Sequence, residues 1–73
     1  MKEAALESCV PQIGETAGEI WERLSNNGTS TVAKLAKEVD QPHDMVMQAL
    51  GWLAREEKIE IVKKGRSRIV SLL

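Results

Sequence analysis

The 73-residue sequence contains no phenylalanine and no tyrosine, and it has a single cysteine and a single histidine. With so few aromatic side chains, we expect the core to consist of Ile, Leu and Val, with Trp21 and Trp52 as its largest members. Cys9 has no second cysteine to pair with, and Cys9 and His43 together are too few ligands for a zinc site. The sequence therefore predicts a domain stabilised by packing alone, without disulfide, metal or cofactor, in which Cys9 is a buried or unreactive thiol.

A long hydrophobic run is also absent. No segment reaches the roughly 20 apolar residues that a membrane-spanning helix needs, and acidic residues occupy the start of the chain, where a signal peptide has an apolar run. We therefore expect a cytoplasmic protein with no membrane partner. The hydrophobic fraction of 42% and the charged fraction of 29% are typical of folded domains. They predict one domain over residues 10–73, preceded by a loose arm over residues 1–9.

The sequence has no excess of positive charge, because its net charge is −1. Domains that bind nucleic acid tightly usually carry a basic excess, so this balance indicates at most a weak binder. The charges are unevenly distributed, however. Residues 58–73 contain five basic residues and one acidic residue, whereas residues 1–57 contain five basic and ten acidic residues. Any attraction for phosphate is therefore expected to come from the C-terminal segment.

Two helices are predicted in the first half of the chain. Apolar residues recur at helical spacing over residues 11–26, at Ile13, Ala17, Ile20 and Leu24. Pro11 suits the first position of this helix, and the Asn-Asn-Gly sequence that ends at Gly28 suits its end. A very short strand is expected near residues 29–30. Ser30 or Thr31 then caps a short second helix, whose apolar positions are Val32, Leu35, Ala36 and Val39.

A third helix is predicted over residues 42–57, with Pro42 at its first position and Val46, Ala49, Leu50 and Leu53 directed inward. Two β-branched runs around Gly65 then predict a hairpin. A four-residue loop over residues 64–67 would pair Ile61 with Val70, whereas a two-residue loop at residues 64–65 would pair Ile61 with Arg68. The first pairing is preferred because it collects more apolar residues on one face.

The order of these elements is that of a winged helix-turn-helix. A short helix, a tight turn, a longer helix and a basic hairpin follow one another between Thr29 and Ser71. The predicted fold class is therefore mainly α with a small β-hairpin (α+β), with three helices and a two- or three-stranded antiparallel wing.

This fold suggests a set of candidate DNA contacts, with helix 42–57 in the major groove and wing 63–68 on the backbone. Gln48 could pair with adenine and Met47 could touch a thymine methyl group, and the start of the second helix could receive a phosphate. Two readings stay open, namely a solvated surface role for His43 and a basic tip that only protects the edge of the sheet. The candidate residues are Ser30, Thr31, His43, Met47, Gln48, Arg55, Lys63, Lys64, Arg66 and Arg68.

Two sequence stretches carry a family resemblance. Ile13-Gly14 with Ala17-Gly18-Glu19-Ile20-Trp21, and the run Gly51-Trp52-Leu53-Ala54-Arg55-Glu56, resemble a small uncharacterised winged helix-turn-helix family of bacteria and archaea. The resemblance extends from about Pro11 to Leu72. It implies the fold and a prokaryotic origin, and it supplies no activity, ligand or contact residue.

Two functional hypotheses remain. The first is a transcription-regulatory module that binds double-stranded DNA weakly and with strong salt dependence. The second is a winged helix that binds a protein partner and no nucleic acid. An enzyme is not expected, because no nucleophile–base pair, metal set or phosphate loop is visible. The chain is expected to be a monomer or a weak homodimer through helix 11–26, where Gly14 and Gly18 lie beside Trp21.

Overall fold

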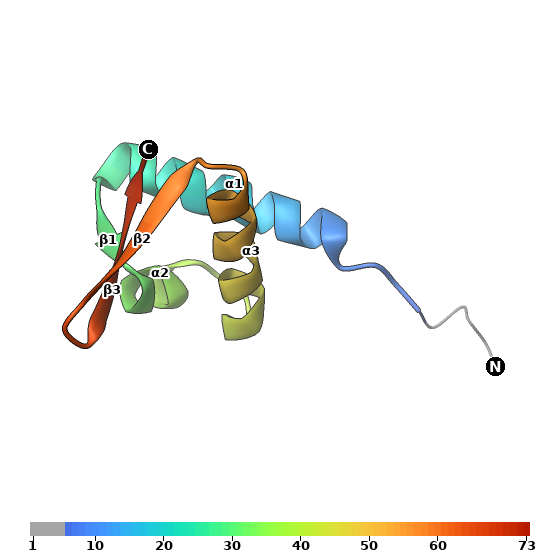
Figure 1. Ribbon diagram of the computed structural model, residues 1–73. Coiled ribbons are helices and arrows are strands. Elements are labelled where there is room, and N and C mark those ends of the chain that lie inside the picture. The colour runs from blue at the N-terminus through green and yellow to red at the C-terminus, as the bar shows by residue number, and fades with distance from the viewer. Residues whose placement is uncertain (1–5) are drawn as a thin grey trace.

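The computed structural model describes residues 6–73 as three helices and one three-stranded antiparallel sheet, which confirms the expected winged helix-turn-helix (Figure 1). The elements are α1 (Val10–Asn27), β1 (Ser30–Thr31), α2 (Val32–Glu38), α3 (His43–Arg55), β2 (Ile59–Lys64) and β3 (Ser67–Leu72). Helix α1 packs against α3, and the sheet closes the other side of the core.

Helix α1 buries the predicted stripe against the rest of the domain, with Ala17, Ile20 and Leu24 almost fully buried. The helix begins at Val10, so Pro11 is its second residue and not its first. Cys9 precedes the helix and is exposed, so the expectation of a buried thiol is wrong. The alternative, an exposed thiol without a role, stays a prediction. Residues 6–9 have no regular secondary structure. The remainder of the expected N-terminal arm, residues 1–5, lies outside the described residues.

The predicted helix boundaries around α2 are correct. Gly28 ends α1 with a φ of 83°, and its N–H donates to the Leu24 carbonyl at 2.9 Å. Thr31 is the N-cap of α2, since its hydroxyl oxygen accepts a hydrogen bond from the Lys34 N–H at 3.1 Å. A helix of seven residues is too short to be stable alone. Its packing on the rest of the domain, with Leu35 only 1% exposed, therefore maintains it.

The sheet has the strand order β1-β3-β2, and β3 is the central strand. The preferred hairpin register is confirmed, because Ile61 pairs with Val70. Lys64 and Ser67 also pair, so the turn itself contains only Gly65 and Arg66. Gly65 has a φ of 63° at the first turn position, as a type II′ turn requires.

The core contains no aromatic side chain, and neither tryptophan belongs to it. Trp21 is 42% exposed and Trp52 is 39% exposed, which contradicts the expectation that they form the largest core pieces. Ala17 and Ala49 are buried where α1 meets α3, and such small side chains allow two helices to approach too closely for an indole ring to fit between them. The rings therefore lie at the rim of this contact. A Cβ atom at Gly14 would come within 3.9 Å of the Trp52 ring.

Helix α3 is shorter than the predicted range of residues 42–57 at both ends. Pro42 is its N-cap, and its last helical residue is Arg55. Glu57 adopts a left-handed conformation with a φ of 61°. Its N–H donates to the Ala54 carbonyl at 3.0 Å, while the Lys58 N–H donates to the Leu53 carbonyl at 3.0 Å. This pair of bonds is a Schellman motif, which the sequence did not reveal because its left-handed position holds glutamate where glycine is usual.

Glycine at this position should stabilise the domain. We expect Glu57→Gly to raise the free energy of unfolding by about 0.5–1 kcal/mol, because glycine adopts left-handed backbone without a Cβ clash. Urea denaturation followed by circular dichroism measures the change. Glu56→Gly is the matched control and should destabilise, because Glu56 has an ordinary φ of −80°. A Glu57→Gly variant less stable than the wild type would contradict the assigned strain.

Candidate nucleic-acid interface

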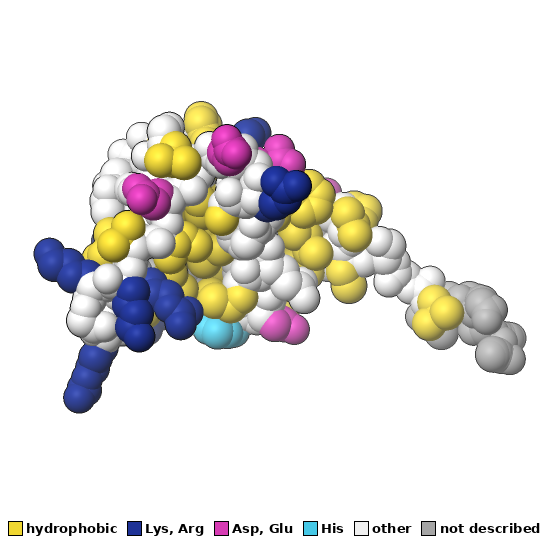
Figure 2. Space-filling model, viewed as in Figure 1, with side chains coloured by type: hydrophobic (Ala, Val, Ile, Leu, Met, Phe, Trp, Pro, Cys, Tyr) yellow, Lys and Arg dark blue, Asp and Glu magenta, His cyan; other side chains and the backbone are white. Residues whose placement is uncertain are grey.

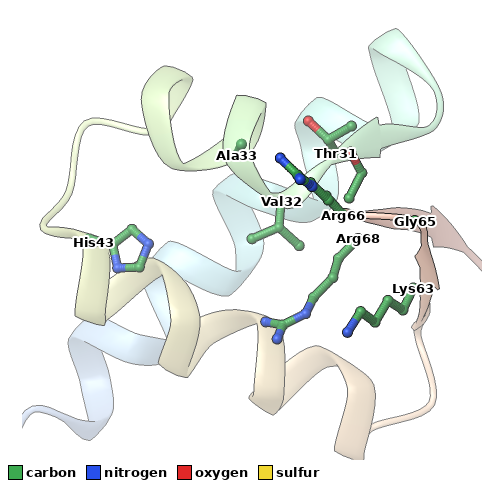
Figure 3. A pocket seen from close by; sticks show the side chains of 9 residues that line it. Thr31, Val32, Ala33, His43, Lys63, Gly65, Arg66 and Arg68 are labelled. Carbon is green, nitrogen blue, oxygen red and sulfur yellow. The ribbon is translucent and has the colours of Figure 1, made fainter.

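A groove of about 510 Å³ separates the wing from the first residues of α2 and α3 (Figure 3). Its walls come from three segments that are distant in sequence. They are joined because β1 pairs with β3, which holds the wing beside the start of α2. The lining residues are Thr31, Val32, Ala33, His43, Lys63, Gly65, Arg66, Ser67 and Arg68.

Two basic residues of the wing lie opposite each other in the hairpin. Lys63 pairs with Arg68 in the register of β2 and β3, so both side chains leave the same face of the sheet. Figure 3 shows them extending into the groove, with Arg66 entering it from the turn. Like charges opposite each other in an antiparallel pair destabilise it by about 0.2–1 kcal/mol. A bound anion would relieve this repulsion.

The groove carries no negative charge of its own. None of its lining residues is acidic. The ion pairs of residues 6–73 involve only Arg23 and Lys34 as bases, with Glu19 and Glu38 as acids, so none uses a wing residue. Most of the Lys and Arg side chains visible in Figure 2 gather at the wing end of the molecule. The wing bases are therefore available to an anionic partner.

The two helices contribute less charge than the wing. His43 is exposed at the first position of α3 and is the groove's only titratable residue from the helices. Thr31 lines the groove, and its hydroxyl oxygen already accepts the capping hydrogen bond of α2, so its proton and its second lone pair remain for a ligand. The Ser30 hydroxyl donates to the Thr31 carbonyl at 3.2 Å, and Ser30 does not line the groove.

The exposed face of α3 differs in part from expectation. Gln48 is exposed as predicted, whereas Met47 is half-buried and packs against the core. Arg55 is exposed at the opposite end of α3 from His43, roughly 18 Å away at the rise of an α-helix. Lys64 projects from the other face of the hairpin and does not line the groove. The structure thus brings together Thr31, His43, Lys63, Arg66 and Arg68 out of the ten candidates.

Four lining residues were not among the candidates. Gly65 and Ser67 alternate with the basic residues of the wing. Their place in that sequence could have indicated that they line the same groove. Val32 and Ala33 gave no such signal, because their proximity to the wing depends on the pairing of β1 with β3.

The described residues show no sign of a metal centre or a membrane segment. Within residues 6–73, no three His, Cys, Asp or Glu side chains are close enough to hold a metal ion. The helices in that range are also too short or too polar to cross a bilayer.

Solved structures show the same architecture. AF1382 from Archaeoglobus fulgidus superposes with a TM-score of 0.65 at 19% sequence identity, over 86% of this chain and 69% of its own. The ArsR family transcriptional regulator RHA00566 superposes with a TM-score of 0.68 at 25% identity, over 90% of this chain and 77% of its own.

Sequence comparison identifies the family. Residues 5–72 match the model of the winged helix-turn-helix domain DUF2582. The uncharacterized protein MJ1608 of Methanocaldococcus jannaschii is 35% identical over 63 residues, which cover 84% of this chain and 90% of that protein. These matches confirm the resemblance seen in the two glycine- and tryptophan-containing stretches. The chain belongs to the DUF2582 family of winged helix-turn-helix domains.

Proposed function

We propose that this domain binds double-stranded DNA as a transcription-regulatory module. The observation that carries the proposal is the groove between wing and helices, whose charged lining residues are all basic and free of ion pairs. The similarity to a regulator of the ArsR family, at 25% identity over 90% of the chain, supports it.

The phosphate backbone enters the groove in this proposal. Lys63 and Arg68 face it from one side of the hairpin, and Arg66 reaches it from the turn. Three charged donors on one short hairpin can each neutralise a phosphate of a strand held in the groove. His43 at the start of α3 borders the same groove, so a strand held there lies beside the first turns of α3.

Base reading is expected to be slight. Gln48 is exposed on α3 and offers an amide that can pair bidentately with adenine. Met47 is half-buried by its packing on the core and has little side chain left for a thymine methyl group. Asp44 is exposed in the first turn of α3 and repels phosphate. Affinity should therefore come mainly from the wing.

The number of phosphate contacts determines how steeply the binding constant for DNA falls with salt concentration. Three phosphate contacts correspond to a slope of about −2.7 in log K against log salt concentration, so affinity falls roughly 40-fold between about 50 and 200 mM salt. The predicted interaction is consequently strong only at low ionic strength.

Removing the opposed pair of bases tests the proposal. We expect Lys63→Ala combined with Arg68→Ala to weaken duplex binding about tenfold at low salt and to reduce the salt slope by about 1.8, because two phosphate contacts are lost. Fluorescence anisotropy with a labelled mixed-sequence duplex, titrated at several salt concentrations, measures both quantities.

The control is Lys37→Ala, which removes an exposed base of α2 that does not line the groove. It should leave the salt slope unchanged. The double variant should fold at least as stably as the wild type, since it loses the like-charge pair. Wild-type protein that fails to bind any duplex at low salt, or a double variant with an unaltered slope, would refute the proposal.

Removing the negative charge of Asp44 should strengthen duplex binding, whereas removing the wing bases should weaken it. We expect Asp44→Asn to raise duplex affinity about two- to fivefold at low salt, and this gain should fade as salt screens the removed repulsion. The same titration measures it. Glu15→Gln, which removes an exposed acid of α1, changes the net charge equally and should have little effect. Equal gains from both variants would show that only net charge matters and that α3 does not face the DNA.

A further inference from the structure

We propose that two copies of this chain associate by pairing their β2 strands, which joins the two sheets into one continuous sheet. β2 is an edge strand, because the strand order is β1-β3-β2 and β2 pairs only with β3. The inference does not depend on DNA binding at the groove beside the wing, here called the basic groove.

The free edge of β2 presents unpaired backbone groups. The Leu73 N–H donates to the Lys58 carbonyl at 3.0 Å, so position 58 directs its carbonyl towards β3. Because this direction alternates along an antiparallel strand, positions 60, 62 and 64 also face β3, and positions 61 and 63 face outward. Within residues 6–73, no further strand pairs with this edge. The backbone groups of Ile61 and Lys63 are therefore available to a strand of another molecule.

This edge has few of the features that usually prevent such pairing. It is six residues long, contains no proline, and keeps its register with β3 without a bulge. Residues 60–64 are all exposed, with Val62 at 47% and Ile61 at 37%. Lys63 and Lys64 are the remaining protection, because lysines on two approaching edges repel each other. A strand that places an acid opposite a lysine would cancel this protection.

A second β2 strand supplies that acid at the required position. When Val62 lies opposite Val62 of the second copy in an antiparallel pair, Glu60 lies opposite Lys64. The twofold axis repeats this pair, so two opposite-charge pairs flank the central valines. Opposite charges directly across an antiparallel pair stabilise it. The strand is thus complementary to itself.

Neighbouring twofold registers bring like charges together. An axis at Ile61 places Lys58 opposite Lys64 of the second copy. An axis at Lys63 places that lysine opposite itself, and an axis at Glu60 does the same with the glutamate. Like charges directly opposite each other destabilise a strand pair. The charge pattern of β2 therefore selects the register centred on Val62.

The same register joins exposed apolar side chains on the outer face of the sheet. Val62 pairs with Ile69 of β3 in each chain, so their side chains leave the same face. Ile69 is half-buried and Val62 is exposed. Across the twofold axis, Ile69 and Val62 of one copy continue into Val62 and Ile69 of the other. This row of four β-branched side chains covers apolar surface that a single chain exposes to water.

The pairing takes no charge from the basic groove. Lys63 projects from the face opposite Val62 and lies opposite Ile61 of the second copy in this register. A lysine stem can cover such an apolar side chain while its ammonium group stays in water. The ion pairs between the copies use Glu60 and Lys64, neither of which lines the groove.

The dimer should be weak. Its strand pairing covers only residues 60–64 on each copy, which is well below the roughly 800 Å² per partner of a standard interface. We therefore expect a dissociation constant of about 10–300 µM.

An exchange of charges between two variants tests the proposal. Sedimentation equilibrium of the full chain from about 5 µM to 2 mM should show reversible dimerisation of the wild type. Glu60→Lys and Lys64→Glu should each weaken it about tenfold or more, because each change places two like-charge pairs across the twofold axis. An equimolar mixture of the two variants should form a heterodimer about as stable as the wild-type dimer, because every charge pair across the axis is again of opposite sign.

The variants should keep their fold. Glu60 pairs with Ser71 and Lys64 with Ser67, and within residues 6–73 neither belongs to an ion pair. Thermal denaturation measures this. Lys37→Glu is the matched control, because it changes the net charge as Lys64→Glu does at an exposed position of α2. It should dimerise like the wild type.

Amide hydrogen exchange reports the strand pairing itself. The Ile61 and Lys63 amides point outward, so their protection should rise with protein concentration. The Val62 amide already faces β3 and should change much less.

Three results would overturn the proposal. The first is a wild type that stays monomeric up to about 2 mM, which would show that the lysines protect the edge. The second is a mixture of Glu60→Lys and Lys64→Glu that forms no heterodimer. The third is dimerisation that both charge changes leave intact and that Gly18→Leu abolishes, which would place the contact on α1.

Discussion

The position of the wing depends on one strand that pairs on both sides. Val70 of β3 pairs with Ser30 of β1 and with Ile61 of β2, and it is fully buried. Because β1 runs directly into α2 through the Thr31 cap, the hairpin cannot move away from the helix-turn-helix without breaking β1–β3 hydrogen bonds and exposing Val70. The basic groove is thus a consequence of strand pairing. Its charged residues contribute nothing to holding it open, and the opposed Lys63 and Arg68 disfavour it.

A second constraint is the close contact of α1 with α3. Buried alanines at positions 17 and 49 bring the helices together and leave a core of Ile, Leu and Val. The indole rings are then excluded to the rim, where Trp52 lies beside Gly14 of α1. The same small residues that make the core compact therefore produce an exposed aromatic surface.

Local signals in the sequence were sufficient for most of the fold. The Gly28 terminus follows from the chemistry of that residue, the cap at Thr31 was one of two candidates, and the hairpin register was preferred over an alternative because it collects apolar residues; the structure confirms all three. The failures concern tertiary contacts. Helical periodicity shows which side of a helix is apolar, yet it does not show how closely two helices approach, so Trp52 was expected inside and Met47 outside. The left-handed Glu57 was missed because tertiary and hydrogen-bond context there outweighs the intrinsic preference for glycine.

For the candidate site, composition was a poor guide and geometry a better one. The net charge of −1 includes acids of α1 that do not line the basic groove. At about 0.1 M salt, charges further apart than about 10 Å are largely screened, so a phosphate in the groove responds mainly to Lys63, Arg66 and Arg68.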